Sequence, residues 1–172
     1  MSPKLQAYFK DYDAYHSTTG NEVCHCFGIP FIVVSLLGLL SAWVIDSGSI
    51  FGSPLLRVDG GLILWALASL WYLFLDWKMG LSFSFVVLGG YFFGRTLPGG
   101  VLWTLFVFGW ILQGIGHAKY EKKSPAFFRN VTHLMIGPLW IFAKITGIGA
   151  ESGGSACASN TPSRESKILK SR

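Results

Sequence analysis

Three polar side chains recur at helical spacing near residue 117. Gln113, His117 and Glu121 are four residues apart, so they lie in one stripe on an α-helix, and Gly114 and Gly116 leave room beside it. Imidazole nitrogens and a carboxylate oxygen are suitable ligands for a divalent transition metal. The stripe therefore predicts a ligand-bearing face. A surface ion pair between His117 and Glu121 is the structural alternative.

The other histidines also stand beside apolar segments. His16 precedes the first apolar segment, His25 stands at its start, and His133 begins the last one. Asn21 stands four residues before His25, so these two form a second pair on one helical face. We predict four metal ligands, His16, His25, His117 and His133. A helix cap at Asn21 and histidines that only reach toward water at the membrane surface remain the alternatives.

The composition is that of an integral membrane protein. Of the 172 residues 51% are hydrophobic and only 13% are charged, and the mean hydropathy is +0.47. No short apolar stretch near the start is followed by a small-residue cleavage site, so we expect no removable signal peptide. The net charge of +5 fits anionic lipids at the cytoplasmic leaflet, and nucleic acid is not an expected partner.

These features predict an all-α fold, a polytopic membrane helix bundle. Residues 3–16 alternate aromatic and charged side chains at helical spacing, which predicts an interfacial amphipathic helix. Residues 46–59 are expected to form a loop. We expect the apolar segments 23–45 and 96–116 to span the membrane. The shorter segments 60–75 and 79–94 form either two thin spans or a re-entrant hairpin. The last segment, 130–143, either spans the membrane or lies shallow in it.

The chain divides into two parts by composition. Residues 1–148 are predicted to form the membrane helical catalytic domain. Residues 149–172 are small, polar and basic, which predicts a flexible, disordered tail. If the segments cross in order, or if 60–75 and 79–94 form a re-entrant hairpin, all four histidines lie on one face. The excess of lysine and arginine on that face predicts that it is cytoplasmic.

Two motifs resemble a known family. Residues 16–30 read H-x4-N-x3-H-x2-G-x-P and residues 113–126 read Q-x2-G-H-x3-E-K-x2-P-A. Together they resemble the family of small membrane 2-hydroxy fatty acid dioxygenases, over about residues 1 to 148. Proteins of this family take part in the conversion of phytosphingosine to odd-numbered fatty acids. The histidine boxes of sterol desaturases and hydroxylases, H-x-x-H-H, are absent from the sequence.

The resemblance implies an Fe(II)-dependent α-oxidation, in which a 2-hydroxy fatty acid and O2 give the fatty acid one carbon shorter. A 2-hydroxy carboxylate can chelate iron through two oxygens and can supply the electrons itself. The family's histidines match His16, His25 and His117, and its polar partners match Asn21 and Glu121. We assign Lys122, Lys123 or Arg129 to steer the carboxylate. The host membrane would be the endoplasmic reticulum or a bacterial inner membrane, and the expected partners are membrane lipid and possible further copies of the chain in a homo-oligomer.

Two other functions fit the same residues. The first is a membrane binding or scaffold protein without enzymatic activity, whose histidines only anchor helix ends. The second is a zinc-dependent lipid hydrolase, in which Glu121 would activate a water molecule. Metal content separates the first from a dioxygenase, and the mass of the product together with the consumption of O2 separates the second.

Overall fold

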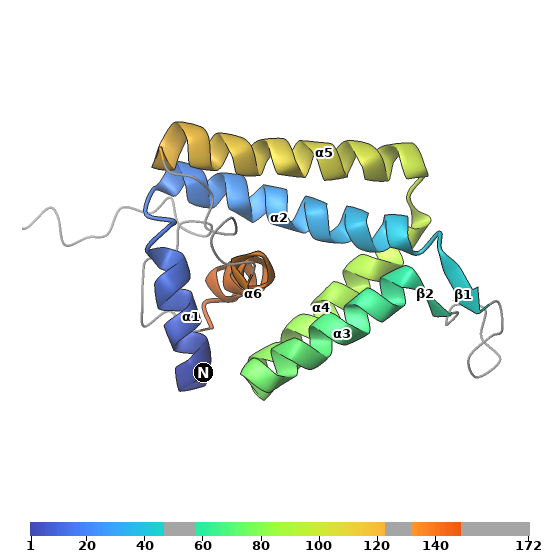
Figure 1. Ribbon diagram of the computed structural model, residues 1–172, viewed down its shortest axis with the longest axis horizontal. Coiled ribbons are helices and arrows are strands. Elements are labelled where there is room, and N and C mark those ends of the chain that lie inside the picture. Colours follow the sequence, from blue (N-terminus) through green and yellow to red (C-terminus); the bar gives the residue numbers. More distant parts are fainter. Residues whose placement is uncertain (47–57, 123–131, 149–172) are drawn as a thin grey trace, which may run out of the picture.

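The computed structural model describes residues 1–46, 58–122 and 132–148, and most of these residues are helical (Figure 1). Two short antiparallel strands form the remaining regular structure of the described chain. The elements are α1 (Pro3–Asp13), α2 (Thr19–Leu40), β1 (Val44–Asp46), β2 (Val58–Asp59), α3 (Gly60–Leu75), α4 (Trp77–Thr96), α5 (Gly99–Ile115), the π-helix η2 (Gly116–Glu121) and α6 (Thr132–Thr146).

The prediction of a mostly helical chain is confirmed, with changes at the ends of the elements. The first apolar helix begins at Thr19 and ends at Leu40, so its predicted end at residue 45 is wrong. The chain instead continues into β1, and Val44 of this strand pairs with Asp59 of β2. Strand β2 lies inside the segment 46–59 that was predicted to form a loop. The predicted tail, 149–172, lies outside the described residues.

Helices α2 and α5 lie side by side along most of their length (Figure 1). Glycines make this approach possible, because a Cβ atom on Gly109 would lie 2.8 Å from the carbonyl oxygen of Gly28. At the other end of α2, a Cβ atom on Gly94 of α4 would lie 2.7 Å from the carbonyl oxygen of Val34. Small residues that let helix backbones touch are typical of membrane helix pairs.

Helices α3 and α4 form an antiparallel hairpin, and the start of α3 and the finish of α4 both lie on the side of β1 and β2 (Figure 1). Asp76 lies between them, and its Oδ1 accepts a hydrogen bond from the Met79 amide, 3.0 Å away, at the start of α4. Its Oδ2 accepts a second one from the Ser2 amide, 2.6 Å away. The N-terminus therefore lies against the α3–α4 turn. The same half of the molecule holds α1, α6, the start of α2 and the end of α5 (Figure 1), and we call it the histidine end because it contains His16, His25 and His117. The opposite end carries β1 and β2.

Helix α6 lies across the histidine end and does not run to the opposite end. Near its start, Nε2 of His133 lies 2.8 Å from a carboxylate oxygen of Asp11 in α1. Near its finish, Nζ of Lys144 lies 2.5 Å from a carboxylate oxygen of Glu22 in the first turn of α2. Both ends of α6 therefore contact elements of the histidine end, and the choice between a spanning and a shallow position for this segment stays a prediction.

The outer faces of the helices are strongly apolar. Two helical stretches of the described chain, Thr19–Leu40 and Gly99–Glu121, are long and apolar enough to cross a membrane. Large hydrophobic side chains remain exposed on each helix from α2 to α6, for example Phe74 at 77%, Phe85 at 66% and Trp103 at 58%. Exposed apolar surface on this scale marks a face that meets lipid or a partner. The interfacial location expected for α1 stays a prediction.

Candidate metal centre

Three histidines from separate elements meet at the histidine end. His16 lies in the turn after α1, His25 lies in α2 and His117 lies in η2. One nitrogen of each ring lies within 4.8 Å of the others, and all three side chains are buried. The spacing of the sequence motifs therefore did identify three residues that the fold brings together.

Hydrogen bonds fix the tautomers of two of these rings. Nδ1 of His16 lies 2.8 Å from the carbonyl oxygen of Tyr12, and Nδ1 of His25 lies 2.9 Å from the carbonyl oxygen of Asn21. A carbonyl oxygen only accepts, so each Nδ1 carries the proton and each Nε2 presents a lone pair. This arrangement of a backbone acceptor behind the ring is common among metal-binding histidines.

The two unprotonated nitrogens lie close together. Nε2 of His16 lies 3.1 Å from Nε2 of His25, and neither nitrogen holds a proton in these tautomers. Burial lowers the pKa of His16 to about 4, so at neutral pH protonation of this ring does not supply the missing hydrogen. A cation between the rings would remove the repulsion, which makes the pair suited to a metal ion.

The site also collects polar atoms without partners. Among the described residues, the buried side-chain nitrogens and oxygens that lack a hydrogen-bond partner belong to Asn21, Gln113, His117 and His133. Each such atom costs about 1–3 kcal/mol when it stays unpaired. Their concentration in one region marks it as a candidate site for a metal ion or ligand that could complete these interactions.

Two of these side chains have room only because a glycine faces them. A Cβ atom on Gly116 would lie 2.3 Å from Oδ1 of Asn21, and one on Gly28 would lie 2.5 Å from Nε2 of Gln113. Both glycines occur in the family motifs, next to the histidines. The absence of a side chain at these two glycines therefore leaves room for the side-chain amides of Asn21 and Gln113 between the packed helices, beside the candidate metal centre.

Glu121 holds the turn that carries His16. Its Oε1 accepts hydrogen bonds from the amides of Ser17, 2.6 Å away, and Thr18, 2.8 Å away. The hydroxyl groups of the same two residues lie 3.1 Å from the carboxylate oxygens. Thr18 is the N-cap of α2 and makes no side-chain cap hydrogen bond, and Glu121 instead binds the amide of this residue and so holds the start of α2. Among the described residues no ion pair joins Glu121 to His117.

His117 and Glu121 share the π-helical turn η2, directly after α5. A π-helix is wider than an α-helix and is found frequently at functional sites. The sequence spacing predicted one continuous α-helical stripe, and this detail is wrong. The two side chains are nevertheless both buried at the histidine end. His117 belongs to the group of three histidines, and Glu121 holds the turn at Ser17 and Thr18.

The remaining predicted residues lie outside this group. Nε2 of His133 is hydrogen bonded to Asp11, and its ring contacts Tyr12 and Tyr15. His133 does not belong to the group of three histidines whose nitrogens lie close together. Its role as a fourth ligand stays a prediction. Lys122 is exposed, in a left-handed backbone conformation with φ 53°. Lys123 and Arg129 lie outside the described residues.

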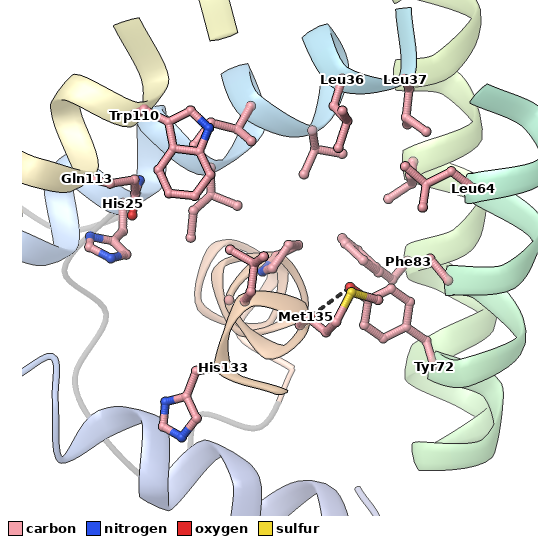
Figure 2. Close-up of a pocket in the computed structure, with 18 of the residues that line it drawn as sticks. His25, Leu36, Leu37, Leu64, Tyr72, Phe83, Trp110, Gln113, His133 and Met135 are labelled. Atoms are coloured by element: carbon pink, nitrogen blue, oxygen red, sulfur yellow. Dashed lines mark hydrogen bonds between the residues drawn. The ribbon is translucent and has the colours of Figure 1, made fainter. Parts of the chain in front are cut away.

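An apolar cavity of about 260 Å3 opens beside the three histidines (Figure 2). The histidines and Gln113 contribute the polar atoms of its lining, and most other lining side chains are aliphatic or aromatic. This volume lies near the lower end of the range for small-molecule sites, about 300–1,000 Å3. The cavity thus combines a small polar region with a larger hydrocarbon surface, as an amphiphilic ligand requires.

Two lining residues were not assigned a role from the sequence. Gln113 belonged to the predicted stripe, and its four-residue spacing from His117 was the available signal. Tyr12 stacks on His16 with ring centroids 4.0 Å apart. This pair is also four residues apart, but in the structure His16 follows the end of α1 and belongs to no helix.

These observations describe a helical protein with a group of three histidines that could hold a metal ion, beside an apolar cavity. The chain belongs to the family described as 2-hydroxy-palmitic acid dioxygenase Mpo1-like, which matches residues 2–148. The resemblance drawn from the two motifs is therefore confirmed. No curated protein and no solved structure matches the chain.

Proposed function

We propose that the protein is an Fe(II)-dependent dioxygenase that converts 2-hydroxy fatty acids and O2 into fatty acids one carbon shorter. The observation that carries the proposal is the group of three buried histidines beside an apolar cavity, in a chain of this family. The family description names 2-hydroxy-palmitic acid. The metal, the reaction and the substrate are our assignments for this chain.

The donor atoms fit iron. Three neutral imidazoles, His16, His25 and His117, would hold the ion and leave coordination positions for other ligands. The unpartnered Nδ1 of His117 and the facing Nε2 atoms of the other two rings are the features that a metal would satisfy. When bound, Fe(II) supplies the site at which O2 and the 2-hydroxy carboxylate react together.

The residues of the chain bind and orient the substrate. The amide of Gln113 lines the cavity with its Nε2 unpartnered, so it can donate a hydrogen bond to a carboxylate or hydroxyl oxygen. Asn21 is fully buried and offers an amide nitrogen and an amide oxygen without partners. The aliphatic and aromatic lining takes up the acyl chain and keeps water away from the reacting head group.

The reaction balances without another reductant. A 2-hydroxy acid, RCH(OH)COOH, reacts with O2 to give RCOOH, CO2 and H2O. The bond between the carboxyl carbon and the hydroxyl-bearing carbon breaks, and a new carbon–oxygen bond forms at the latter. The substrate is oxidised, and the electrons it loses reduce O2, one oxygen atom entering the new carboxyl group and the other leaving as water.

Glu121 acts in this proposal as a positioning residue. Its carboxylate oxygens accept hydrogen bonds from Ser17 and Thr18 and keep His16 in place. These contacts do not favour the zinc hydrolase, which needs Glu121 free to activate water. Lys122 would guide the anionic head group toward the site from the aqueous side, as its exposure allows.

We further propose that the protein is a multi-pass membrane protein with the histidine end on the cytoplasmic face. The exposed apolar surfaces of α3, α4 and α5 support contact with lipid. The ion pair of Lys144 with Glu22 adds a further cation to the histidine end, whereas Arg95 lies near the end of α4, at the opposite end. The excess of cations at the histidine end follows the positive-inside rule.

Anaerobic reconstitution tests the proposal. Purified protein is loaded with Fe(II), then given O2 and 2-hydroxypalmitate, and bound iron, O2 uptake and the mass of the product are measured. We expect one equivalent of iron and a product one carbon shorter, with both lost in His117→Ala. His133→Ala is the matched histidine variant, which retains iron if the three-histidine group is the centre.

Other outcomes would favour the other functions. Absence of histidine-dependent iron binding would favour a scaffold. Release of a lipid head group without O2 uptake would favour the zinc hydrolase. Chain shortening that persists in His117→Ala would contradict the assigned centre.

A further inference from the structure

The cavity is polar on one side only. Figure 2 shows His25 and Gln113 on one side and Tyr72, Phe83 and Leu64 on the other. The apolar side is built by α3 and α4. The residues that these two helices contribute to the lining are Leu64, Trp65, Ala68, Tyr72, Phe83 and Val87.

The polar atoms on the α3–α4 side already have partners. The hydroxyl group of Tyr72 donates a hydrogen bond to the carbonyl oxygen of Met135 in α6, 2.7 Å away. Nε1 of Trp65 donates to the carbonyl oxygen of Ser84, 2.9 Å away. This side of the cavity therefore offers hydrocarbon contact and no free hydrogen-bonding group, so an amphiphilic ligand has only one favourable orientation, with its tail toward α3 and α4.

The tail would meet a rigid wall. The rings of Tyr72 and Phe83 pack edge to face with centroids 5.1 Å apart, and Phe83 contacts Phe142 of α6 at 5.3 Å. Both residues are almost fully buried. The hydrogen bond from Tyr72 to α6 fixes one ring, and close packing fixes the other, so neither ring can swing aside without breaking contacts in the core.

We propose that Tyr72 and Phe83 limit the length of the acyl chain, and that Ala68 sets the depth in front of them. Ala68 lies one helical turn before Tyr72 and also lines the cavity, so its small side chain leaves space that a larger one would fill. The identity of the ligand as a 2-hydroxy fatty acid rests on the proposed function. The wall itself rests on the packing and hydrogen bonds of these residues.

The expected discrimination follows from hydrocarbon burial. Each methylene group transferred from water into an apolar cavity changes a binding constant about fourfold. Chains that just reach the wall gain this factor at every added carbon, and longer chains lose it because they must bend or leave part of the tail outside. Wild-type binding should therefore rise with chain length and then level or fall.

The test uses a homologous series of 2-hydroxy fatty acids with chains shorter and longer than palmitate. Binding is measured without O2 by displacement of radiolabelled 2-hydroxypalmitate, and turnover is measured with O2. Ala68→Leu should move the preferred length to shorter chains, with a loss of about tenfold or more for the longest acids. Phe83→Ala should move it to longer chains.

Two matched variants control for general effects. Ala66→Leu adds the same atoms to α3 at an exposed position, and Phe85→Ala removes the same ring from α4 where it is 66% exposed. Neither should change the preferred length. Ala68→Leu adds atoms at a residue that lines the cavity and removes none from the core, so it still provides the test if Phe83→Ala fails to fold.

The outcomes separate this proposal from the proposed function. An unchanged length profile in Ala68→Leu, or an equal shift in Ala66→Leu, would overturn the wall even if wild-type protein shortens the acids. If wild-type protein binds the series and Ala68→Leu shifts the profile, but no acid is shortened, the wall stands and the dioxygenase assignment fails.

Discussion

Two buried polar clusters lie at opposite ends of α2, and they differ in how completely their atoms are paired. At the histidine end, Asn21, Gln113 and His117 keep buried polar atoms without partners. At the opposite end, Asp59 is fully buried, yet its oxygens accept hydrogen bonds from the Leu62 amide at 2.9 Å and the Tyr91 hydroxyl at 2.8 Å.

The difference separates a structural cluster from a functional one. Arg95 extends the Asp59 cluster through a hydrogen bond of 3.2 Å to the Tyr91 hydroxyl, so the described polar groups there stabilise α3 and α4 without any ligand. The histidine cluster is left incomplete by the protein alone. Both clusters bury polar groups. Among the described residues, the buried atoms without hydrogen-bond partners belong to the histidine cluster, and these atoms are the reason for proposing a metal and a substrate there.

The largest expected effect comes from His25→Leu. Loss of one ligand should weaken Fe(II) binding by about a thousandfold, or about 4 kcal/mol. The metal-free variant should be at least as stable as the metal-free wild type, because the facing lone pairs of His16 and His25 are removed. Metal titration and thermal unfolding in detergent measure the two quantities. A strongly destabilised metal-free variant would contradict the view that this cluster is incomplete without metal.

Asp59→Ala should give the opposite result. It leaves the Tyr91 hydroxyl and the Leu62 amide without their acceptor, which should lower the free energy of unfolding by about 3 kcal/mol. Fe(II) affinity should stay within a few-fold of wild type, because the variant lies at the far end of α2. If iron binding fell as much as in His25→Leu, the two clusters would not be independent.

Gln113→Leu should impair substrate binding with little effect on folding. The variant removes an unpartnered amide nitrogen and with it the proposed hydrogen bond to an anionic oxygen, so KM for 2-hydroxypalmitate should rise about tenfold or more. The iron content should not change. Gln113→Asn is the conservative comparison, and a KM that is unchanged in both variants would exclude contact of this amide with the head group.

The smallest expected effect concerns Asp76, a carboxylate of the histidine end that has its partners. Although burial opposes ionisation, hydrogen bonds from Met79 and Ser2 hold the pKa of this carboxyl below its usual range. Its stabilisation is therefore present above its unfolded-state pKa and is lost as the pH falls through the folded-state pKa. Asp76→Asn should lower the free energy of unfolding by about 1 kcal/mol at pH 7, and the difference from wild type should shrink near pH 3.

The sequence predicts the three histidines well because their positions depend on regular features. Helical spacing places Asn21 and His25 on one face, and the number of apolar segments returns the chain to its starting end. The Asp59 cap was missed, although an aspartate directly before an apolar helical run is a recognised start signal. It was assigned to a loop because residues 46–59 hold glycine, serine and proline. The pairing of β1 with β2 joins residues on both sides of that segment, and no local pattern specifies it.

Other features depend on contacts between distant parts of the chain. The hydrogen bonds of Glu121 to the turn at Ser17 and Thr18 require η2 and the start of α2 to be already in contact. The pairing of His133 with Asp11 likewise depends on how α6 docks against α1. No local pattern in the sequence specifies such partners, and the four-residue spacing also gave no sign of the π-helical turn.

The separation of His16, His25 and His117 along the chain has a consequence for biogenesis. His16 and His25 are synthesised early, but His117 follows α3, α4 and the whole of α5. A nascent chain that ends before residue 117 can offer at most two of the three imidazoles. Under the proposed function, iron would therefore be acquired only after α3, α4 and α5 have been made and α5 has docked beside α2, so metal loading would report that this part of the protein has assembled.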